Sequence, residues 1–508
     1  MKRFFYLFAA IAAFAVLFSS CKKDNEEVKN DGKAELLSFG FYAADNKGVL
    51  TEDYVADVSN EMVIRLPEGT DKTALVARFT VGDNDKVYVG TTEQIDSTTA
   101  NDYTYPVDFV VKDEEANVSA SYTVKVGKIL QYKWNQVLAF NDVDASSNIL
   151  PNRDFAMAIS PKDNVPYFFI SRTEGDLYEG RVGKLENGDM TLGAKISTDI
   201  DGNAIDARNV DIAVSEDGLV YALYYDYAAQ KMFVKTGSGD SWTIVGSSSF
   251  GGVRCGSYYA LGVDPVSKYP VVGYYANAAL TGVIARRDLD LCYFDGASWS
   301  TENLISDISG KYIFNPKMAV YNGALYLAGT VQGDGGTYFV YKYENNAWTK
   351  VVNALPEGVS QPNIVGLGFG VASDGTVYLC AGGDEDANGT WTLNVYKAAA
   401  GESTWTRVST ALNLTLSSSA KYTMALNNDL PVVFYKDAET ELPMIVSLDA
   451  ETKQWGSPVT LGTDKIAIKN VQLKYDSDGN GYAAFIDGSD NATLRVYKYA
   501  MEADDLAE

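Results

Sequence analysis

The chain has 508 residues, of which 46% are hydrophobic, and it contains four cysteines and no histidine. Without histidine the chain cannot form Ser-His-Asp or Cys-His nucleophilic sites, histidine-ligated metal centres or histidine acid–base pairs. The formal net charge of −25 and the lack of a clustered basic segment argue against nucleic acid as a partner, because phosphate binding needs a basic patch.

The first twenty residues have the pattern of a signal peptide. Lys2 and Arg3 are followed by an apolar stretch that is short for a membrane span, and small residues then lead to Cys21. This pattern resembles the bacterial lipoprotein lipobox, which implies that Cys21 becomes the acylated first residue of the mature chain. Phe18 stands where that family prefers leucine. An ordinary secretory peptide with an incidental cysteine is the alternative.

Charged and small residues after Cys21 predict a flexible tether over 21–33, behind a signal peptide of residues 1–20. The acidic run in this tether resembles the signal that sends Bacteroidetes lipoproteins to the cell surface, although a solvated linker explains the same residues. The resemblance implies a protein held at the outer membrane by lipid alone and exposed at the cell surface. The other three cysteines, Cys255, Cys292 and Cys380, cannot all be paired within the chain, and Cys292 and Cys380 stand in apolar strand patterns. We therefore expect buried thiols instead of a disulfide framework.

Residues 34–127 predict an antiparallel β-sandwich, because short alternating runs are bounded by turn residues. The six expected strands cover 35–43, 62–66, 74–81, 86–89, 107–111 and 120–126. The segments 66–71 and 121–126 resemble immunoglobulin-like or cadherin-like modules of Bacteroidetes surface lipoproteins. The resemblance implies a spacer, with adhesion through this domain as the alternative.

Two sequence anchors recur about every fifty residues between 128 and 501. The first is a short apolar strand, centred on Tyr167, Tyr221, Val271, Tyr326, Tyr378, Val432 and Tyr482. The second is a tryptophan that opens another strand, at Trp134, Trp242, Trp299, Trp348, Trp405 and Trp455, with Met190 in the remaining place. Four strands in each period predict a seven-bladed β-propeller. The strand at Trp134 precedes the first blade, so we expect it to complete the last blade and thereby remove an open sheet edge. Residues 502–508 are expected to form an acidic tail.

The loops that enter the innermost strand of each predicted blade hold the candidate ligand-binding residues. Guanidinium groups bind carboxylates, and tyrosine rings contact sugar faces, so cations and tyrosines gathered at one rim predict a glycan or other small polar ligand. The cations are Arg153, Arg208, Arg254, Lys421 and Lys469, and the tyrosines are Tyr258, Tyr312 and Tyr422. Simple pairing of these cations with Asp154, Asp206 and Asp464 is the alternative.

One turn matches the spacing of a calcium loop. Asp476, Asp478, Asn480 and Asp487 stand at positions 1, 3, 5 and 12 of that template, and oxygen ligands suit Ca²⁺. The alternative is a hairpin turn, because two other predicted blades carry Asp-Gly at the same place. No other cofactor is expected.

No motif singles out a nucleophile or a pair of catalytic carboxylates, so we assign no catalytic residue. The expected function is non-catalytic carbohydrate capture at one face of the propeller, by analogy with Bacteroidetes surface lipoproteins. A propeller glycoside hydrolase or polysaccharide lyase stays open, as does a protein-binding or adhesion scaffold. An outer-membrane protein is a further candidate partner.

Overall fold

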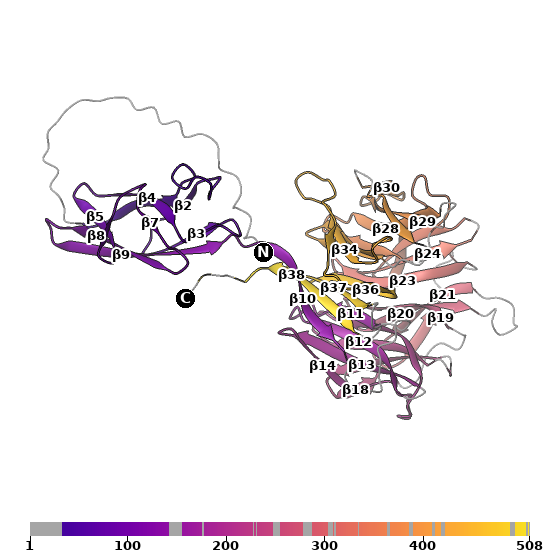
Figure 1. Cartoon of the computed structure of the whole chain (residues 1–508). Coiled ribbons are helices and arrows are strands. Elements are labelled where there is room, and N and C mark those ends of the chain that lie inside the picture. The colour runs from indigo at the N-terminus through magenta and orange to yellow at the C-terminus, as the bar shows by residue number, and fades with distance from the viewer. Residues whose placement is uncertain are drawn as a thin grey trace. The chain divides into compact units, whose positions relative to one another are not determined.

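The computed structural model describes residues 33–141, 155–174, 177–226, 228–229, 231–246, 255–277, 287–302, 308, 311–333, 335–362, 366–385, 390–408, 412–417, 422–487, 493–503 and 506. The chain divides into two compact units, Met1–Gln131 with Ala503–Glu508, and Tyr132–Glu502. The named elements are all β-strands, which confirms the predicted all-β class (Figure 1). Across these ranges, no helix is long and apolar enough to cross a membrane.

The first unit consists of two sheets around an aromatic core. One sheet has the order β2 (Tyr54–Ala56), β1 (Leu36–Phe41), β4 (Leu75–Val81) and β7 (Ala100–Asn101). The other has the order β3 (Glu61–Leu66), β9 (Val118–Lys128), β8 (Val107–Asp113), β5 (Asp85–Val89) and β6 (Thr92–Gln94). Phe39, Phe41 and Phe109 are buried at the centre, with their rings edge to face. The expectation of wholly antiparallel pairing is wrong for β3 and β9, which are parallel.

The second unit contains seven sheets, each of which is one blade of a propeller. Blade one is β11 (Phe155–Ile159), β12 (Pro166–Glu174), β13 (Leu177–Glu186) and β14 (Asp189–Lys195). Blade two is β15 (Ala207–Val214), β16 (Val220–Asp226), β17 (Lys231–Ser238) and β18 (Ser241–Ile244). Blade three is β19 (Cys255–Val263), β20 (Pro270–Asn277), β21 (Arg287–Phe294) and β22 (Trp299–Glu302). Blade four is β23 (Tyr312–Tyr321), β24 (Ala324–Gln332), β25 (Thr337–Glu344) and β26 (Ala347–Ala354).

Blades five to seven complete the propeller. Blade five is β27 (Gly368–Val371), β28 (Val377–Glu385), β29 (Thr390–Ala398) and β30 (Thr406–Arg407), with β31 (Leu414–Ser417) also paired to β29. Blade six is β32 (Tyr422–Asn427), β33 (Leu430–Lys436), β34 (Pro443–Ser447) and β35 (Val459–Thr460). Blade seven is β36 (Ile466–Tyr475), β37 (Gly481–Asp487), β38 (Leu494–Met501) and β10 (Tyr132–Phe140).

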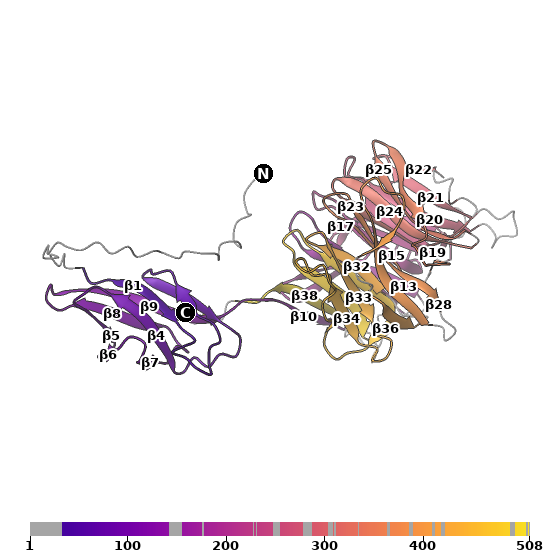
Figure 2. The ribbon, with the colours of Figure 1, turned by 90° about the horizontal axis from the view of Figure 1, so that it is seen from above.

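Strand β10 closes the propeller by pairing with β38, as predicted (Figures 1 and 2). Trp134 on β10 packs against Tyr499 and Tyr475, with ring centroids 5.2 and 6.5 Å away. This closure removes an open sheet edge. Blade six departs from the expected pattern, because its outermost strand β35 begins four residues after Trp455, which forms only an isolated bridge to Leu448.

The innermost strand of every blade alternates between two kinds of residue. A large apolar side chain packs between blades at every second position, and these residues are Met157, Ile212, Leu261, Met318, Phe369, Met424 and Leu473. The residues on either side of each one are small or polar. Successive side chains of a strand point to opposite faces. The large apolar residues therefore lie on one face of each inner strand, and the small or polar residues that flank them lie on the other. Cys292 and Cys380 are buried free thiols, in the third strand of blade three and the second strand of blade five, respectively.

Candidate functional site

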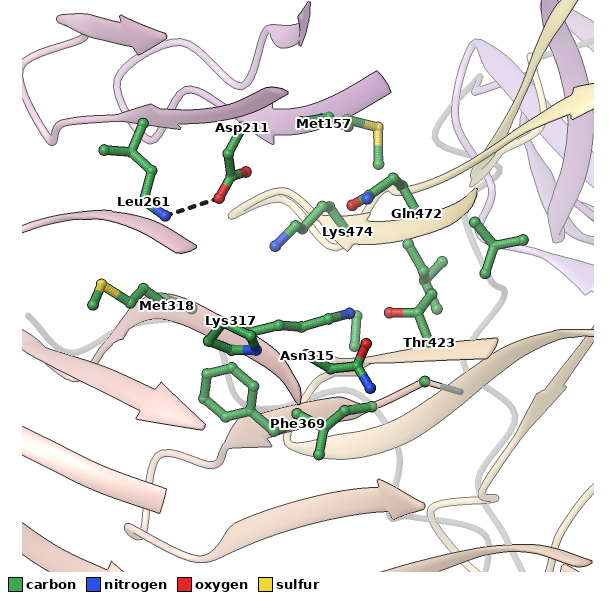
Figure 3. Close-up of a pocket in the computed structure, with 18 of the residues that line it drawn as sticks. Met157, Asp211, Leu261, Asn315, Lys317, Met318, Phe369, Thr423, Gln472 and Lys474 are labelled. Carbon is green, nitrogen blue, oxygen red and sulfur yellow. Dashed lines mark hydrogen bonds between the residues drawn. The ribbon is translucent and has the colours of Figure 1, made fainter. Parts of the chain in front are cut away.

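A cavity of about 330 Å³ lies among the innermost strands of all seven blades. Its volume is at the lower end of the range for small-molecule sites, roughly 300–1,000 Å³. The polar side chains that line it include Asp211, Asn315, Lys317, Thr423, Gln472 and Lys474. Figure 3 shows them extending into the same space from blades two, four, six and seven. The innermost strands of these four blades therefore supply the charged, amide and hydroxyl groups named here.

Strand pairing places seven equivalent residues, one from each blade, in a set that we call ring one. Each is paired with the anchor residue near the start of the second strand of its blade. Ring one consists of Ala158, Ala213, Gly262, Ala319, Gly370, Ala425 and Lys474. Six of the seven blades thus have alanine or glycine where blade seven has lysine.

A second set, ring two, lies two residues earlier on the same strands. It consists of Ala156, Asp211, Ala260, Lys317, Gly368, Thr423 and Gln472. Three of its members are small, and the other four carry charged, hydroxyl or amide groups. The charged and amide side chains of the cavity, apart from Asn315, therefore all come from these two rings.

Small residues suit the rings because neighbouring inner strands approach closely. A β-carbon added to Gly368 would lie 2.5 Å from the backbone nitrogen of Met424, in the next blade. A β-carbon on Gly370 would lie 2.6 Å from Cγ of Leu426. Real β-carbons do not come this close to other heavy atoms, so the packing favours glycine there. In blades where a ring residue is long, its side chain extends into the cavity instead (Figure 3).

Asp211 joins the inner strands of blades two and three. Its carboxylate accepts hydrogen bonds from the backbone N–H of Leu261 at 2.8 Å and of Ile212 at 2.9 Å (Figure 3). Burial raises the pKa of Asp211 to about 6, while these two hydrogen bonds and the positive charges of Lys474 and Lys317 act in the opposite direction. The carboxyl group therefore titrates close to physiological pH.

The cavity also holds a lysine and an unusual backbone position. Burial lowers the pKa of Lys474, and the negative charge of Asp211 partly offsets this effect. Asn315 has a left-handed backbone with φ of 49°, at a register shift between Phe314 and Lys317. Such bulges bend a strand and redirect its side chains, and asparagine tolerates this conformation better than most residues. The bulge brings both Asn315 and Lys317 to the cavity wall.

The structure brings together only part of the predicted rim site. Tyr258 and Tyr422 line the cavity, and burial raises the pKa of each. The Tyr422 hydroxyl donates to the Gly366 carbonyl and accepts from the Gly382 N–H, so it has a structural role. Tyr312 is 36% exposed and is not a lining residue.

The predicted cations can be placed only by their backbone. Arg208 and Lys469 lie in β15 and β36, three residues before Asp211 and Gln472, and their side chains are outside the described part of the chain. Arg153, Arg254, Lys421 and the lipidation candidate Cys21 lie wholly outside it. Of the aspartates expected to pair with them, Asp464 contacts Arg495 at 3.2 Å and Asp206 accepts a hydrogen bond from the Tyr178 N–H.

The predicted calcium ligands are not brought together. The Asp476 carboxylate accepts hydrogen bonds from the backbone of Asp478 and from the backbone and side chain of Asn480, which makes a hairpin turn. Asp487 lies at the other end of β37, roughly 20 Å along the strand, and is paired with Arg495 at 2.8 Å. In the described ranges, no group of three or more acidic or cysteine side chains is placed to hold a metal ion. These residues do not fit Ca²⁺.

The sequence interpretation missed Asp211, Lys317, Gln472 and Lys474, although the sequence contains a signal for Lys474. Aligned on the anchors, each inner strand contains a triplet with a large apolar residue in the middle and a small residue in third place, as in Ala156-Met157-Ala158. Gln472-Leu473-Lys474 is the triplet that breaks this pattern at its third position. A comparison of the repeats with one another would therefore have found Lys474.

Comparisons with known proteins match one part of the chain to a family. Residues 45–126 match the family model described as SGBP, N-terminal, which is the N-terminal domain of surface glycan-binding proteins. This match covers most of the first unit of the structure. No curated protein matches the chain.

Several solved structures are similar to the chain. An alpha-L-arabinanase of Penicillium chrysogenum is 10% identical, with 72% of this chain and 98% of that chain covered and a TM-score of 0.39. A GH93 alpha-L-arabinofuranosidase of Fusarium graminearum is also 10% identical, with 71% and 97% covered and a TM-score of 0.40. The Aleuria aurantia lectin is 11% identical, with 58% and 94% covered and a TM-score of 0.35.

Proposed function

We propose that this chain is a lipid-anchored protein of the bacterial cell surface that captures carbohydrate, without cleaving it, in the channel of its propeller. The match of residues 45–126 supports the location and the ligand class, since proteins of that family bind glycans at the surface of Bacteroidetes. The observation that carries the choice of the propeller is its cavity, which is lined by polar side chains from four blades.

Capture is favoured over cleavage by the carboxylates of the cavity. Glycoside hydrolases need two carboxyl groups that face the scissile bond, roughly 5–10 Å apart. Asp211 is the one carboxylate among the described lining residues, and both of its oxygens accept backbone hydrogen bonds. A single carboxylate used in this way supports a binding role.

The other parts of the chain have roles in presentation. Acylation of Cys21 anchors the chain, residues 21–33 form the tether, and the sandwich acts as an immunoglobulin-like spacer. Tyr258 supplies a half-buried ring at the cavity wall for contact with a sugar. The proposal extends to the rim, because Arg208 precedes Asp211 by three residues, which is roughly 10 Å along a strand.

Titration of the full-length protein with neutral and acidic polysaccharides, combined with chromatography of the same mixtures, tests this function. We expect binding without products, weakened in an Arg208→Ala, Lys469→Ala double variant. Release of sugar fragments would make the protein an enzyme, and absence of binding across the panel would point to a protein partner instead. The anchor is tested by Cys21→Ser, which should move the protein out of the membrane fraction.

A further inference from the structure

Lys474 is the one long side chain in ring one, all seven members of which the structure describes. The other six blades have the same strand pairing at this position and hold alanine or glycine there. The propeller therefore forms with a small residue at this position. The fold therefore does not require a lysine in blade seven, and we attribute the presence of Lys474 to a role in the cavity.

The ammonium group of Lys474 has no close partner among the described residues. It makes no hydrogen bond or ion pair with any of them, and Asp211 attracts it only from a longer distance. The group extends into the cavity (Figure 3), where the wall replaces part of the water around it. A partly desolvated and unpaired ammonium group costs free energy, and an anion bound beside it would recover that cost.

The charges of the cavity favour one negative group on the ligand. Among the described lining residues, Lys317 and Lys474 stand against a single carboxylate, Asp211, so this part of the lining carries one net positive charge in a chain of formal charge −25. This balance matches a carboxylate, which carries one negative charge. A phosphate monoester, at about −1.5 to −2 near pH 7, would leave excess negative charge.

The uncharged polar groups of the cavity suit hydroxyl groups. The amides of Asn315 and Gln472 and the hydroxyl of Thr423 lie around the same space as the lysines (Figure 3). An amide offers two N–H donors and a carbonyl acceptor, and a hydroxyl can donate and accept. These groups can therefore bind several hydroxyls of one small molecule, whichever way each hydroxyl is oriented.

We propose that the channel cavity binds the carboxylate of a polyhydroxylated acid, of the uronic acid type, with Lys474 as its direct partner and Lys317 as a second positive charge. This inference rests on the proposed function and specifies the ligand class of the same site. The acid enters either as a uronic acid residue of a glycan or as a free sugar acid, since both present the same carboxylate and hydroxyl groups.

Calorimetry on the full-length protein tests the inference with matched ligands. Galacturonic, glucuronic and mannuronic acid are each compared with the neutral parent hexose, which differs only at C6, and trigalacturonic acid is compared with its monomer. The test variant is Lys474→Ala, which gives blade seven the residue found in four other blades. The control is Lys498→Ala, which removes a lysine that lies over the Tyr482 ring, outside the cavity.

We expect the natural chain to bind at least one acid about tenfold or more tightly than its parent sugar, because an ion-paired hydrogen bond is strong in a partly desolvated site. Lys474→Ala should lose this preference, and Lys498→Ala should keep it. Tighter binding of the trimer identifies a glycan as the source, and binding of the monomer alone identifies a free sugar acid.

Three results would overturn the inference: no acid preferred by the natural chain, a preference that survives Lys474→Ala, or a preference lost equally in Lys498→Ala. Failure of this inference is distinct from failure of the proposed function. If neutral polysaccharides bind and the acids are not preferred, carbohydrate capture stands and the carboxylate site does not. If no carbohydrate binds at all, both fail.

Discussion

The channel wall contains two kinds of blade. In blades one, three and five, rings one and two hold only alanine and glycine, whereas blades two, four, six and seven place polar side chains there. Both kinds share the same strand pairing and the same large apolar residue between the rings, such as Met157 in blade one and Leu473 in blade seven. The comparison teaches that the apolar positions form the propeller, while the rings can be adapted to a ligand.

The small-residue blades should tolerate no added bulk where their strands touch the next blade. We expect Gly368→Ala to lower the free energy of unfolding by about 3 kcal/mol, since the new methyl group would overlap the Met424 backbone. Denaturant unfolding measures this change. The control is Gly456→Ala, at an exposed site where the nearest atom to a β-carbon is 3.6 Å away, and an equal loss there would show that ring packing is not the cause.

Asp211 should make the polar blades sensitive to pH. Its pKa is about 6 when folded, against an ordinary value of 3.8, so between these values the folded chain holds a proton that the unfolded chain has lost. The stabilising effect of this proton is complete below pH 3.8 and is lost as pH rises through 6. The free energy of unfolding of the natural chain, relative to Asp211→Asn, should fall by about 2 kcal/mol from pH 4.5 to 7.

Chemical denaturation of both proteins at several pH values measures this difference. The asparagine side chain of the variant is close in shape to aspartate and does not titrate, so the difference between the two curves isolates the carboxyl group. A flat difference across the range would show that Asp211 does not titrate there and that its environment is more strongly solvated than the structure indicates.

The Lys474→Ala variant gives blade seven a small residue in ring one, like the other six blades, and should leave the stability of the protein almost unchanged. We expect the free energy of unfolding to change by less than about 0.5 kcal/mol or to rise, because the variant removes a partly desolvated charge without leaving an unpaired partner. Thermal unfolding measures it. A large loss of stability would mean that Lys474 supports the propeller and that the contrast between the two kinds of blade is structural.

Most of the propeller could be predicted from local patterns that repeat. The spacing of the anchors predicts the length of one blade. The position of Trp134 before the first blade predicts that its strand completes the last blade, as the pairing of β10 with β38 confirms. Both features depend only on the order of strands along the chain. The outermost strand of blade six was not predicted correctly by these patterns. Its outermost strand is only two residues long and follows Trp455 at a distance, so the tryptophan there does not mark a strand.

The cavity could be predicted less well, because its residues come from strands about fifty residues apart. Which residue of β15 falls in ring two depends on the register with β16, and a bulge between Arg208 and Val210 shifts that register. Candidates taken from the loops that enter the innermost strands therefore lie at the rim, and the residues of the channel wall are missed. Bulges in β19, β23 and β36 have the same consequence for the prediction.

The pairing of β10 with β38 determines how the propeller bears a load. Eight residue pairs join the two strands in antiparallel register. The N-terminal part of the chain enters the propeller at the first residue of β10, so a pull on it reaches these pairs first. The component of that force along β10 loads the pairs in shear, because ladder hydrogen bonds run across the strands. If the chain is anchored at its N-terminal end and holds a ligand in its channel, as proposed above, tension between anchor and ligand passes first through blade seven, which is also the blade that supplies Lys474.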